Sequence, residues 1–298
     1  MDLFIKFCEE NGIKILLNEP LCNHLTFKVG GECAAMVFPH TESLLLGCIG
    51  FLRNNKVKHY IIGNGSNLIA SDTGYDGVII NTCDFREIKT EYGEYIECSA
   101  GVPLINICRY ALDNSLTGIE FAYGIPGTAG GAIYMNAGAY GGEMKDIIDS
   151  VRYLDTDGEI RTARFDELEL GYRKSMFTGT DLVILSLCIK LNKGNPDNIE
   201  AEMKDIIGRR KDKQPLEYPS AGSTFKRPEG YYAGALIEEC GLKGYSVGGA
   251  CVSEKHAGFV INKGGASCSD ILAVIDHCRK TVYEQTGVTL ETEVRFIQ

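Results

Sequence analysis

The sequence predicts a protein of mixed helices and strands arranged in two or three domains. The chain has 298 residues, of which 44% are hydrophobic and 23% charged, as in a globular protein with a substantial core. The whole chain contains 35 glycines, and in its first two-thirds glycines separate short apolar runs of strand length. Amphipathic runs at helical spacing lie among these strands and become longer toward the end.

In the first two-thirds, β-branched and apolar runs predict strands, and each run ends near a turn-forming residue. The predicted strands cover residues 58–63, 77–81, 95–101 and 181–191. Residues 151–164 predict a hairpin that turns at Asp157 and Gly158. A helix is expected over 103–115, because proline is tolerated in a first helical turn.

A domain boundary is expected at residues 191–198, LNKGNPDN, where glycine, proline and asparagine cluster. The helix predicted next carries apolar residues at helical spacing, namely Ile199, Met203, Ile206 and Ile207. Strands follow within 245–253 and 258–265. Ser267 and Asp270 form a capping-box signal before an amphipathic helix. From residue 288 the pattern alternates, which predicts a strand with Val288, Leu290, Val294 and Phe296 on one face.

Composition excludes several classes of function. The net charge of −10 argues against nucleic acid or an anionic membrane surface as a partner. No apolar run is long enough to span a bilayer, and the N-terminus lacks the pattern of a signal peptide. The twelve cysteines are spaced singly, without a CxxC pair, which favours reduced thiols and a cytoplasmic location over a disulfide framework.

Two glycine-rich stretches are candidate phosphate sites. In IIGNGSNLIA, Gly63, Gly65 and Ser66 follow a predicted strand, so backbone amides could face an anion. Another strand pattern follows where a Rossmann motif needs a helix, and Leu68 stands where that motif needs a third glycine, so the Rossmann interpretation fails. A simple hairpin turn is the alternative.

The second stretch, residues 123–143, contains seven glycines among small residues. Small side chains let the backbone approach a ligand closely. Two such stretches without the lysine of a Walker motif favour a large dinucleotide over a nucleoside triphosphate. Dense packing of turns in a strand-rich domain is the alternative.

Three polar signals lie in the second half. Arg173 stands in GYRKSMF, Ser223 lies in SAGSTFKRP beside Lys226 and Arg227, and Glu293 lies on the terminal strand pattern. An arginine can pair with a carboxylate through two hydrogen bonds, and serine or glutamate can take part in proton transfer. Solvated strand faces and a glycine turn are the ordinary alternatives.

The order of these motifs resembles the bacterial UDP-N-acetylenolpyruvoylglucosamine reductase family. The resemblance runs from Asn23 to Gln298 and rests on NHLTFKVGG, IIGNGSNLIASDTGYDG, GIPGTAGGAIYMNAGAYGGE, YRKSMF, SAGSTFKRP, LKGYSVGGACVSEKHAGFVIN and LETEVRFIQ. The short spacing between YRKSMF and SAGST is similar to that of the compact subclass, which lacks an extra loop over the substrate.

The resemblance implies an α+β fold, with a two-lobed FAD-binding domain of the vanillyl-alcohol-oxidase (PCMH) type and a smaller α+β substrate domain. The implied ranges are 1–80 and 81–195 for the FAD lobes and 196–298 for the substrate domain. It implies FAD contacts at Gly63, Asn64, Gly65, Ser66, Asn67, Leu68, Tyr123, Gly124, Pro126, Gly127, Thr128, Gly131, Ala137 and Gly138.

The resemblance also implies roles for residues around the substrate. Ser223 is the expected proton donor, with Arg173 and Glu293 as its partners at the substrate carboxylate. The expected substrate contacts are Tyr172, Lys213, Arg227 and His256. Some members of the family carry asparagine at the position of Arg227 and glutamine at that of His256.

The implied reaction is reduction of UDP-N-acetylglucosamine enolpyruvate to UDP-N-acetylmuramate, with NADPH as the reductant and FAD as the bound cofactor. The partners are then small molecules, with no metal and no obligate protein partner. One alternative is another FAD oxidoreductase on the same scaffold, acting on a sugar or an alcohol. A non-catalytic nucleotide-binding protein is a second, and a colourless protein after reconstitution with FAD would favour it.

Overall fold

The computed structural model describes residues 1–91 and 93–297, and its contacts divide the chain into two compact units. Unit 1 consists of Met1–Leu16, Ala35–Asn64 and Gly77–Arg209. Unit 2 consists of Leu17–Ala34, Gly65–Asp76 and Arg210–Gln298, of which Gln298 lies outside the described residues. The predicted ranges 1–80, 81–195 and 196–298 remain a prediction, because compactness does not show which residues hold FAD.

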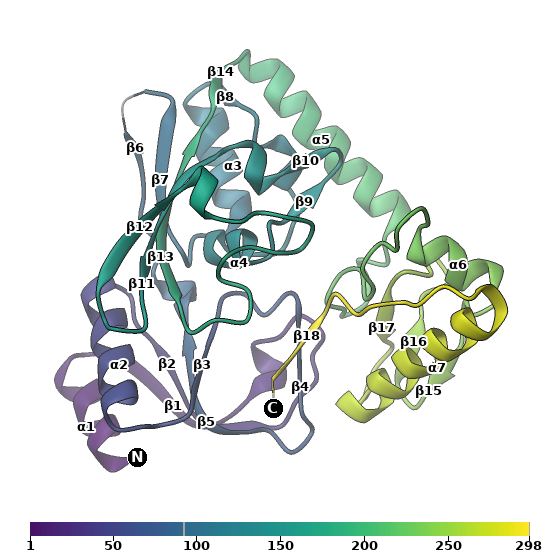
Figure 1. Ribbon diagram of the computed structural model, residues 1–298, viewed down its shortest axis with the longest axis horizontal. Helices are drawn as coiled ribbons and strands as arrows, with labels where there is room; N and C mark the ends of the chain where they lie inside the picture. The colour runs from purple at the N-terminus through teal and green to yellow at the C-terminus, as the bar shows by residue number, and fades with distance from the viewer. Residues whose placement is uncertain (92, 298) are drawn as a thin grey trace. The chain divides into compact units, whose positions relative to one another are not determined.

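The larger sheet of unit 1 has five strands in the order β12-β11-β13-β7-β6, and every neighbouring pair is antiparallel (Figure 1). The strands are β6 (Ile88–Glu91), β7 (Tyr95–Ser99), β11 (Ile148–Leu154), β12 (Ile160–Arg164) and β13 (Val183–Lys190). The predicted hairpin and the strands predicted within 95–101 and 181–191 are confirmed.

Two helices pack their apolar residues against this sheet. They are α3 (Leu104–Asp113) and α4 (Ala129–Tyr134), whose Leu104, Ile107 and Ile133 join one buried core with Ile96 and Leu187 of the strands. Pro103 is the N-cap of α3, so the helix predicted there is confirmed. The start of α4 is thereby fixed on the sheet, directly after the glycines of residues 124–127.

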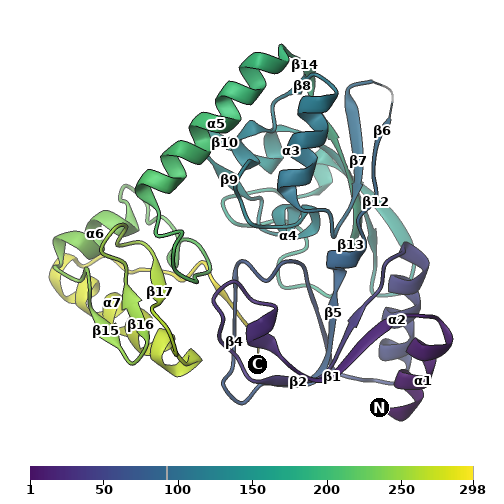
Figure 2. The same cartoon turned by 180° about the vertical axis from the view of Figure 1, so that it is seen from behind.

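The second sheet has four strands in the order β1-β2-β5-β3. They are β1 (Lys14–Pro20), β2 (Glu32–Phe38), β3 (His59–Ile62) and β5 (Tyr75–Asn81), and β3 is parallel to β5. In unit 1, the helices α1 (Asp2–Glu10) and α2 (Glu42–Asn54) pack against this sheet (Figure 2). Their buried residues Phe4, Cys8, Leu45 and Leu52 share a core with Val37 and Ile80. This packing fixes the end of β3, from which the first glycine loop (residues 63–68) starts.

The remaining elements before residue 194 are short. They are η1 (Leu21–Asn23), β4 (Leu68–Ala70), η2 (Thr82–Asp84), β8 (Leu116–Thr117), η3 (Glu120–Ala122), β9 (Gly138–Ala139), β10 (Gly142–Glu143), η4 (Met144–Asp146), η5 (Phe165–Glu167) and β14 (Asn192–Lys193). The long helix α5 (Pro196–Lys213) follows. Its predicted apolar residues Ile199, Met203 and Ile206 are buried, whereas Ile207 is only half-buried.

In unit 2, a small antiparallel sheet is covered by two helices. Its strands are β15 (Ser246–Val247), β16 (Ala250–Val252) and β17 (Val260–Asn262), and the helices are α6 (Ala233–Glu239) and α7 (Cys268–Thr286). The predicted capping box is confirmed: the Ser267 hydroxyl accepts the Asp270 N–H at 3.0 Å, and the Asp270 carboxylate accepts the Ser267 N–H at 3.0 Å.

The terminal strand differs from its prediction. Only Arg295–Ile297 forms a strand, β18, which pairs in parallel with β4. Phe296 is 37% exposed and Ile297 is 1% exposed, so placing Phe296 on the buried face was wrong. Leu290 packs in the core beneath α7, and the chain then changes partner to pair with β4. Residues 288–297 therefore do not form one continuous strand.

Candidate active site

In unit 1, the start of the first glycine loop lies against the second glycine segment (residues 123–143). A Cβ on Gly63 would collide with the side chain of Thr128, so only glycine permits this approach. The Asn64 side chain donates a hydrogen bond to the Pro126 carbonyl at 2.7 Å. Two stretches that the sequence predicted to contact one dinucleotide are therefore adjacent within this unit.

In unit 2, the rest of the loop packs on residues 24–26. Gly65 has φ +62°, and a Cβ there would collide with the His24 carbonyl and with Leu25. The Thr26 N–H donates to the Gly65 carbonyl at 3.3 Å. The alternative of a simple hairpin is wrong, because β3 pairs with β5 whereas β4 pairs with β18.

The loop has the donors that a pyrophosphate needs. Within residues 1–91 and 93–297, no hydrogen bond is made by the backbone N–H groups of residues 64–67. In the second segment, Gly131 is exposed, and the nearest atom to a Cβ there would be the Thr128 Oγ1 at 3.6 Å. Unpaired amides beside glycine can cradle phosphate oxygens, so residues 65–67 of unit 2 fit the diphosphate of FAD.

Asn136 anchors the last part of the second segment in unit 1. Its side chain is fully buried; Nδ2 donates to Glu143 Oε2 at 2.7 Å and to the Gly171 carbonyl at 3.0 Å. Its Oδ1 accepts the Lys145 N–H at 2.9 Å. The predicted contacts Ala137 and Gly138 follow Asn136 directly, at the start of the β9–β10 hairpin.

Arg173 lies in a tight turn of unit 1. Gly171 and Lys174 form a bridge across this turn, and Arg173 has φ +55°, a left-handed conformation that costs free energy for a residue with a side chain. Its guanidinium carbon lies 5.2 Å from the centre of the Tyr172 ring, and Nη2 lies 3.5 Å from the Gly138 carbonyl oxygen. The turn therefore brings the predicted residues Arg173 and Tyr172 to the second glycine segment.

Ser223 and Glu293 are brought together in unit 2. The residue after Ser223, Thr224, accepts the Glu293 N–H at its carbonyl at 2.8 Å, and Phe225 forms a bridge with Thr292. Ser223 is exposed, and Glu293 is half-buried. The Asn67 side chain also donates to the Glu293 carbonyl at 3.2 Å. The first glycine loop, the serine segment and the glutamate segment are therefore joined within unit 2.

The remaining predicted substrate residues all belong to unit 2. Lys213 is exposed at the end of α5. The Arg227 guanidinium carbon lies 4.0 Å from the centre of the Tyr232 ring. His256 Nδ1 accepts the Gly258 N–H at 3.1 Å, and burial lowers the pKa of its imidazole, which favours the neutral ring.

Sequence analysis did not single out Thr224, which is fully buried beside Ser223. Its N–H donates to the Gly258 carbonyl at 2.8 Å, and its hydroxyl accepts the Val260 N–H at 2.9 Å. The only sequence signal is a third hydroxyl, after Ser220 and Ser223, in the run SAGST. Thr224 holds Ser223 against β17, so the serine has a defined position within this unit.

The described residues lack two other features, a metal-binding cluster and a membrane-spanning helix. In residues 1–91 and 93–297, no cluster of histidine, cysteine, aspartate or glutamate could hold a metal ion. Among the helices of the same residues, none combines the length and the apolar character that crossing a membrane requires.

The fold and the glycine loops define an FAD-binding protein, and comparison with known proteins agrees. Residues 33–164 match the family model of an FAD binding domain, and residues 214–297 match that of the UDP-N-acetylenolpyruvoylglucosamine reductase C-terminal domain. Over 283 residues the chain is 48% identical to a UDP-N-acetylenolpyruvoylglucosamine reductase of Clostridium botulinum strain Hall, covering 95% of this chain and 92% of the relative. The chain belongs to the UDP-N-acetylenolpyruvoylglucosamine reductase family.

Solved structures agree with this assignment. The crystal structure of the UDP-N-acetylenolpyruvylglucosamine reductase from Thermus caldophilus superposes with a TM-score of 0.80 at 31% identity, covering 96% of this chain and 99% of that one. A BBE-like 1 variant from Physcomitrella patens superposes with a TM-score of 0.50 at 14% identity, covering 64% of this chain and 44% of that one. This protein is alike in fold alone. The predicted family and the predicted FAD-binding and substrate-domain fold are confirmed.

Proposed function

We propose that this protein reduces UDP-N-acetylglucosamine enolpyruvate to UDP-N-acetylmuramate, a step in the synthesis of peptidoglycan precursors. The observation that carries the proposal is 48% identity to a reductase of this name over 95% of the chain. FAD is the cofactor and NADPH the reductant, and the substrates are small molecules. A different FAD oxidoreductase on this scaffold is not favoured, because the C-terminal residues 214–297 match this reductase family specifically.

FAD, when bound, would supply the redox chemistry that moves a hydride from NADPH to the β-carbon of the enolpyruvyl group. This addition leaves negative charge on the α-carbon and on the neighbouring carboxylate oxygens. We assign Arg173 to the carboxylate, because a guanidinium can donate two parallel hydrogen bonds to it. Positive charge fixed in advance at this position stabilises the developing anion without rearrangement of solvent.

We assign the proton to Ser223, whose hydroxyl donates to the α-carbon and completes the reduction. Glu293, in its protonated form, donates a hydrogen bond to the same developing anion. The backbone hydrogen bond between Thr224 and Glu293 supports a joint role for the two side chains. Arg227 lies four residues after Ser223 and adds positive charge to this segment, which favours the ionised form of the serine after transfer, whereas the Lys226 ammonium is paired with the Glu291 carboxylate at 3.0 Å.

Tyr172, Lys213, Arg227 and His256 are assigned to the sugar nucleotide or to NADPH. The predicted FAD contacts in residues 63–68, 123–131 and 137–138 are assigned to the cofactor. We also assign the protein to the cytoplasm, to cell-wall biogenesis and hence to cell shape and division. The acidic net charge of −10 supports small-molecule partners over nucleic acid or an anionic membrane.

Anaerobic half-reactions test the function and the role of Ser223 separately. NADPH should bleach the flavin of the wild-type protein, and the enolpyruvyl sugar should restore its colour. In Ser223→Ala, reduction by NADPH should be unchanged, whereas reoxidation by the sugar should slow roughly a hundredfold to ten-thousandfold, the range for loss of a general acid. Ser220→Ala, in the same segment, is the matched control and should behave as wild type.

Two outcomes would contradict these assignments. A wild-type flavin that the enolpyruvyl sugar does not reoxidise would refute the proposed reaction. A Ser223→Ala protein that is reoxidised at the wild-type rate would remove Ser223 as the proton donor. Loss of both half-reactions together with loss of bound flavin would instead identify a folding defect in that variant.

A further inference from the structure

Thr26 makes hydrogen bonds to two segments of unit 2 that the proposed function uses. Its backbone N–H donates to the Gly65 carbonyl in the first glycine loop at 3.3 Å. Its hydroxyl donates to the Ser220 carbonyl at 2.7 Å. Ser220 stands three residues before Ser223 in the sequence. One residue therefore links the segment that carries the expected proton donor to the loop that fits the FAD diphosphate.

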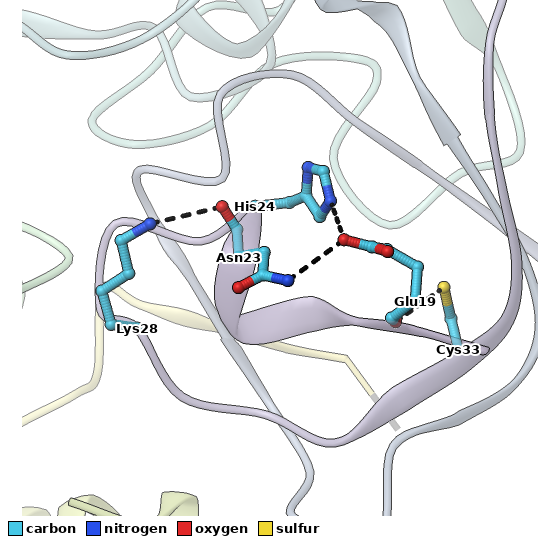
Figure 3. A network of polar contacts seen from close by, with 5 residues as sticks. All are labelled: Glu19, Asn23, His24, Lys28 and Cys33. Carbon is cyan, nitrogen blue, oxygen red and sulfur yellow. Dashed lines mark hydrogen bonds and ion pairs between the residues drawn. The ribbon is translucent and has the colours of Figure 1, made fainter. Parts of the chain in front are cut away.

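The segment around Thr26 is held firmly. Figure 3 shows the side chains of Asn23 and His24 directed at the Glu19 carboxylate, with distances of 3.2 and 2.8 Å to Oε1. The Lys28 ammonium donates to the Asn23 carbonyl at 3.3 Å. Leu25 and Phe27, on either side of Thr26, are buried in unit 2. Because both ends of this segment are fixed, the Thr26 hydroxyl has a defined position from which to donate.

The hydrogen bond from Thr26 holds the residues that precede Ser223, whereas other contacts hold those that follow it. After Ser223, Thr224 is fixed by three hydrogen bonds to Gly258, Val260 and Glu293. Before it, Gly222 adopts φ +75°, a left-handed conformation that glycine reaches without strain and that adds no side-chain contact. Among the described residues, the hydrogen bonds that hold that side are one from the Thr26 hydroxyl to the Ser220 carbonyl and one from the Asn262 N–H to the Pro219 carbonyl at 2.9 Å, and Ala221 is buried in the core of unit 2.

We propose that Thr26 is a positioning residue whose hydroxyl sets the place of the Ser223 Oγ relative to the first glycine loop. This inference rests on the proposed function, in which Ser223 donates the proton. Proton transfer requires the donor within hydrogen-bond reach of the accepting carbon, so a small displacement of the serine slows it strongly. The Thr26 N–H to Gly65 belongs to the backbone and survives any change of side chain.

Thr26→Val removes the hydroxyl and keeps the shape of the side chain and the backbone N–H. The dissociation constant for FAD and the rate of reduction by NADPH should stay at their wild-type values. Reoxidation by the enolpyruvyl sugar should slow about tenfold to a hundredfold, as expected for a misplaced reacting group. Thr26→Ser restores the donor and should restore the rate. Thr286→Val removes a comparable hydrogen bond, from Thr286 to the Val282 carbonyl in α7, and serves as the control.

The outcomes separate this inference from the proposed function. If Ser223→Ala is reoxidised slowly and Thr26→Val at the wild-type rate, the positioning role is refuted and the proton donor stands. If Ser223→Ala is reoxidised at the wild-type rate, the proposed function of Ser223 fails first. Weaker FAD binding in Thr26→Val but not in Thr26→Ser would place the effect on the glycine loop and overturn the inference. Thr26→Ala decides the same question if the valine variant does not fold.

Discussion

Replacing Asn136 with alanine should destabilise unit 1 by about 4 kcal/mol. The side chain is fully buried and makes three hydrogen bonds, to Glu143, to Gly171 and from Lys145. At about 1 kcal/mol for each lost hydrogen bond, these contribute about 3 kcal/mol. Asn136 has φ +41°, and alanine in the left-handed region costs about 1 kcal/mol more.

Urea and thermal unfolding of the FAD-bound protein measure this effect. A loss of about 4 kcal/mol should lower the melting temperature by about 10 °C for a unit of this size. Asn136→Gly loses the same three hydrogen bonds but tolerates the positive φ, so it should recover part of the backbone cost. Asn11→Ala, which removes one exposed hydrogen bond to Phe7, is the matched control and should change stability little.

If Asn136→Ala lowers the melting temperature as little as Asn11→Ala does, the reasoning is refuted, because the buried hydrogen bonds would then contribute no net stability.

The position of Arg173 gives a second readout. Asn136 holds the carbonyl of Gly171, two residues before Arg173. Its loss should therefore raise the KM for the enolpyruvyl sugar more than it slows flavin reduction by NADPH.

Two further predictions concern unit 2 and its turns. Burial raises the pKa of the Asp72 carboxyl, but hydrogen bonds from the Ser269 hydroxyl and amide and from the Cys268 amide outweigh it and lower the pKa. The stabilisation is therefore fully present above the unfolded pKa of about 3.9 and is lost as the pH falls through the lower pKa of the folded state. Asp72→Ala should cost about 1 kcal/mol in urea unfolding at neutral pH, and a difference that does not shrink as the pH falls through that folded-state pKa would contradict this origin. Gly74→Ala should lower the free energy of unfolding by more than about 2 kcal/mol, because its Cβ would collide with the backbone carbonyl of Glu32. Gly158 is also at positive φ but in open space, so Gly158→Ala should cost only about 1 kcal/mol. Equal melting temperatures of the two variants would refute the steric argument.

Local pattern was sufficient to predict most helices and strands. The capping box of Ser267 and Asp270 located the start of α7, and the Asp157–Gly158 turn located the β11–β12 hairpin. Alternation failed after residue 288, because pairing with β4 is a contact between distant segments that no local pattern encodes. For the same reason, local sequence pattern could not predict that unit 2 is built from three separate stretches of the chain.

The candidate site was predictable only as a set of residue types. The glycines were visible in the sequence because close backbone approach requires them, as at Gly63 against Thr128. The pairing of Ser223 with Glu293 became visible only through the backbone bond at Thr224. Thr26 and Asn136 have ordinary residue types, and their importance lies in which carbonyls they reach, which only the folded chain defines.

The pairing of β18 with β4 has a consequence for the order of events during translation. All segments of unit 1 lie within the first 209 residues, so it can complete its packing while the ribosome is still extending the chain. Unit 2 cannot, because Arg295 donates its N–H to the Asn67 carbonyl and β18 is synthesised more than two hundred residues after β4. We therefore expect nascent chains that do not yet include β18 to hold an unfinished first glycine loop.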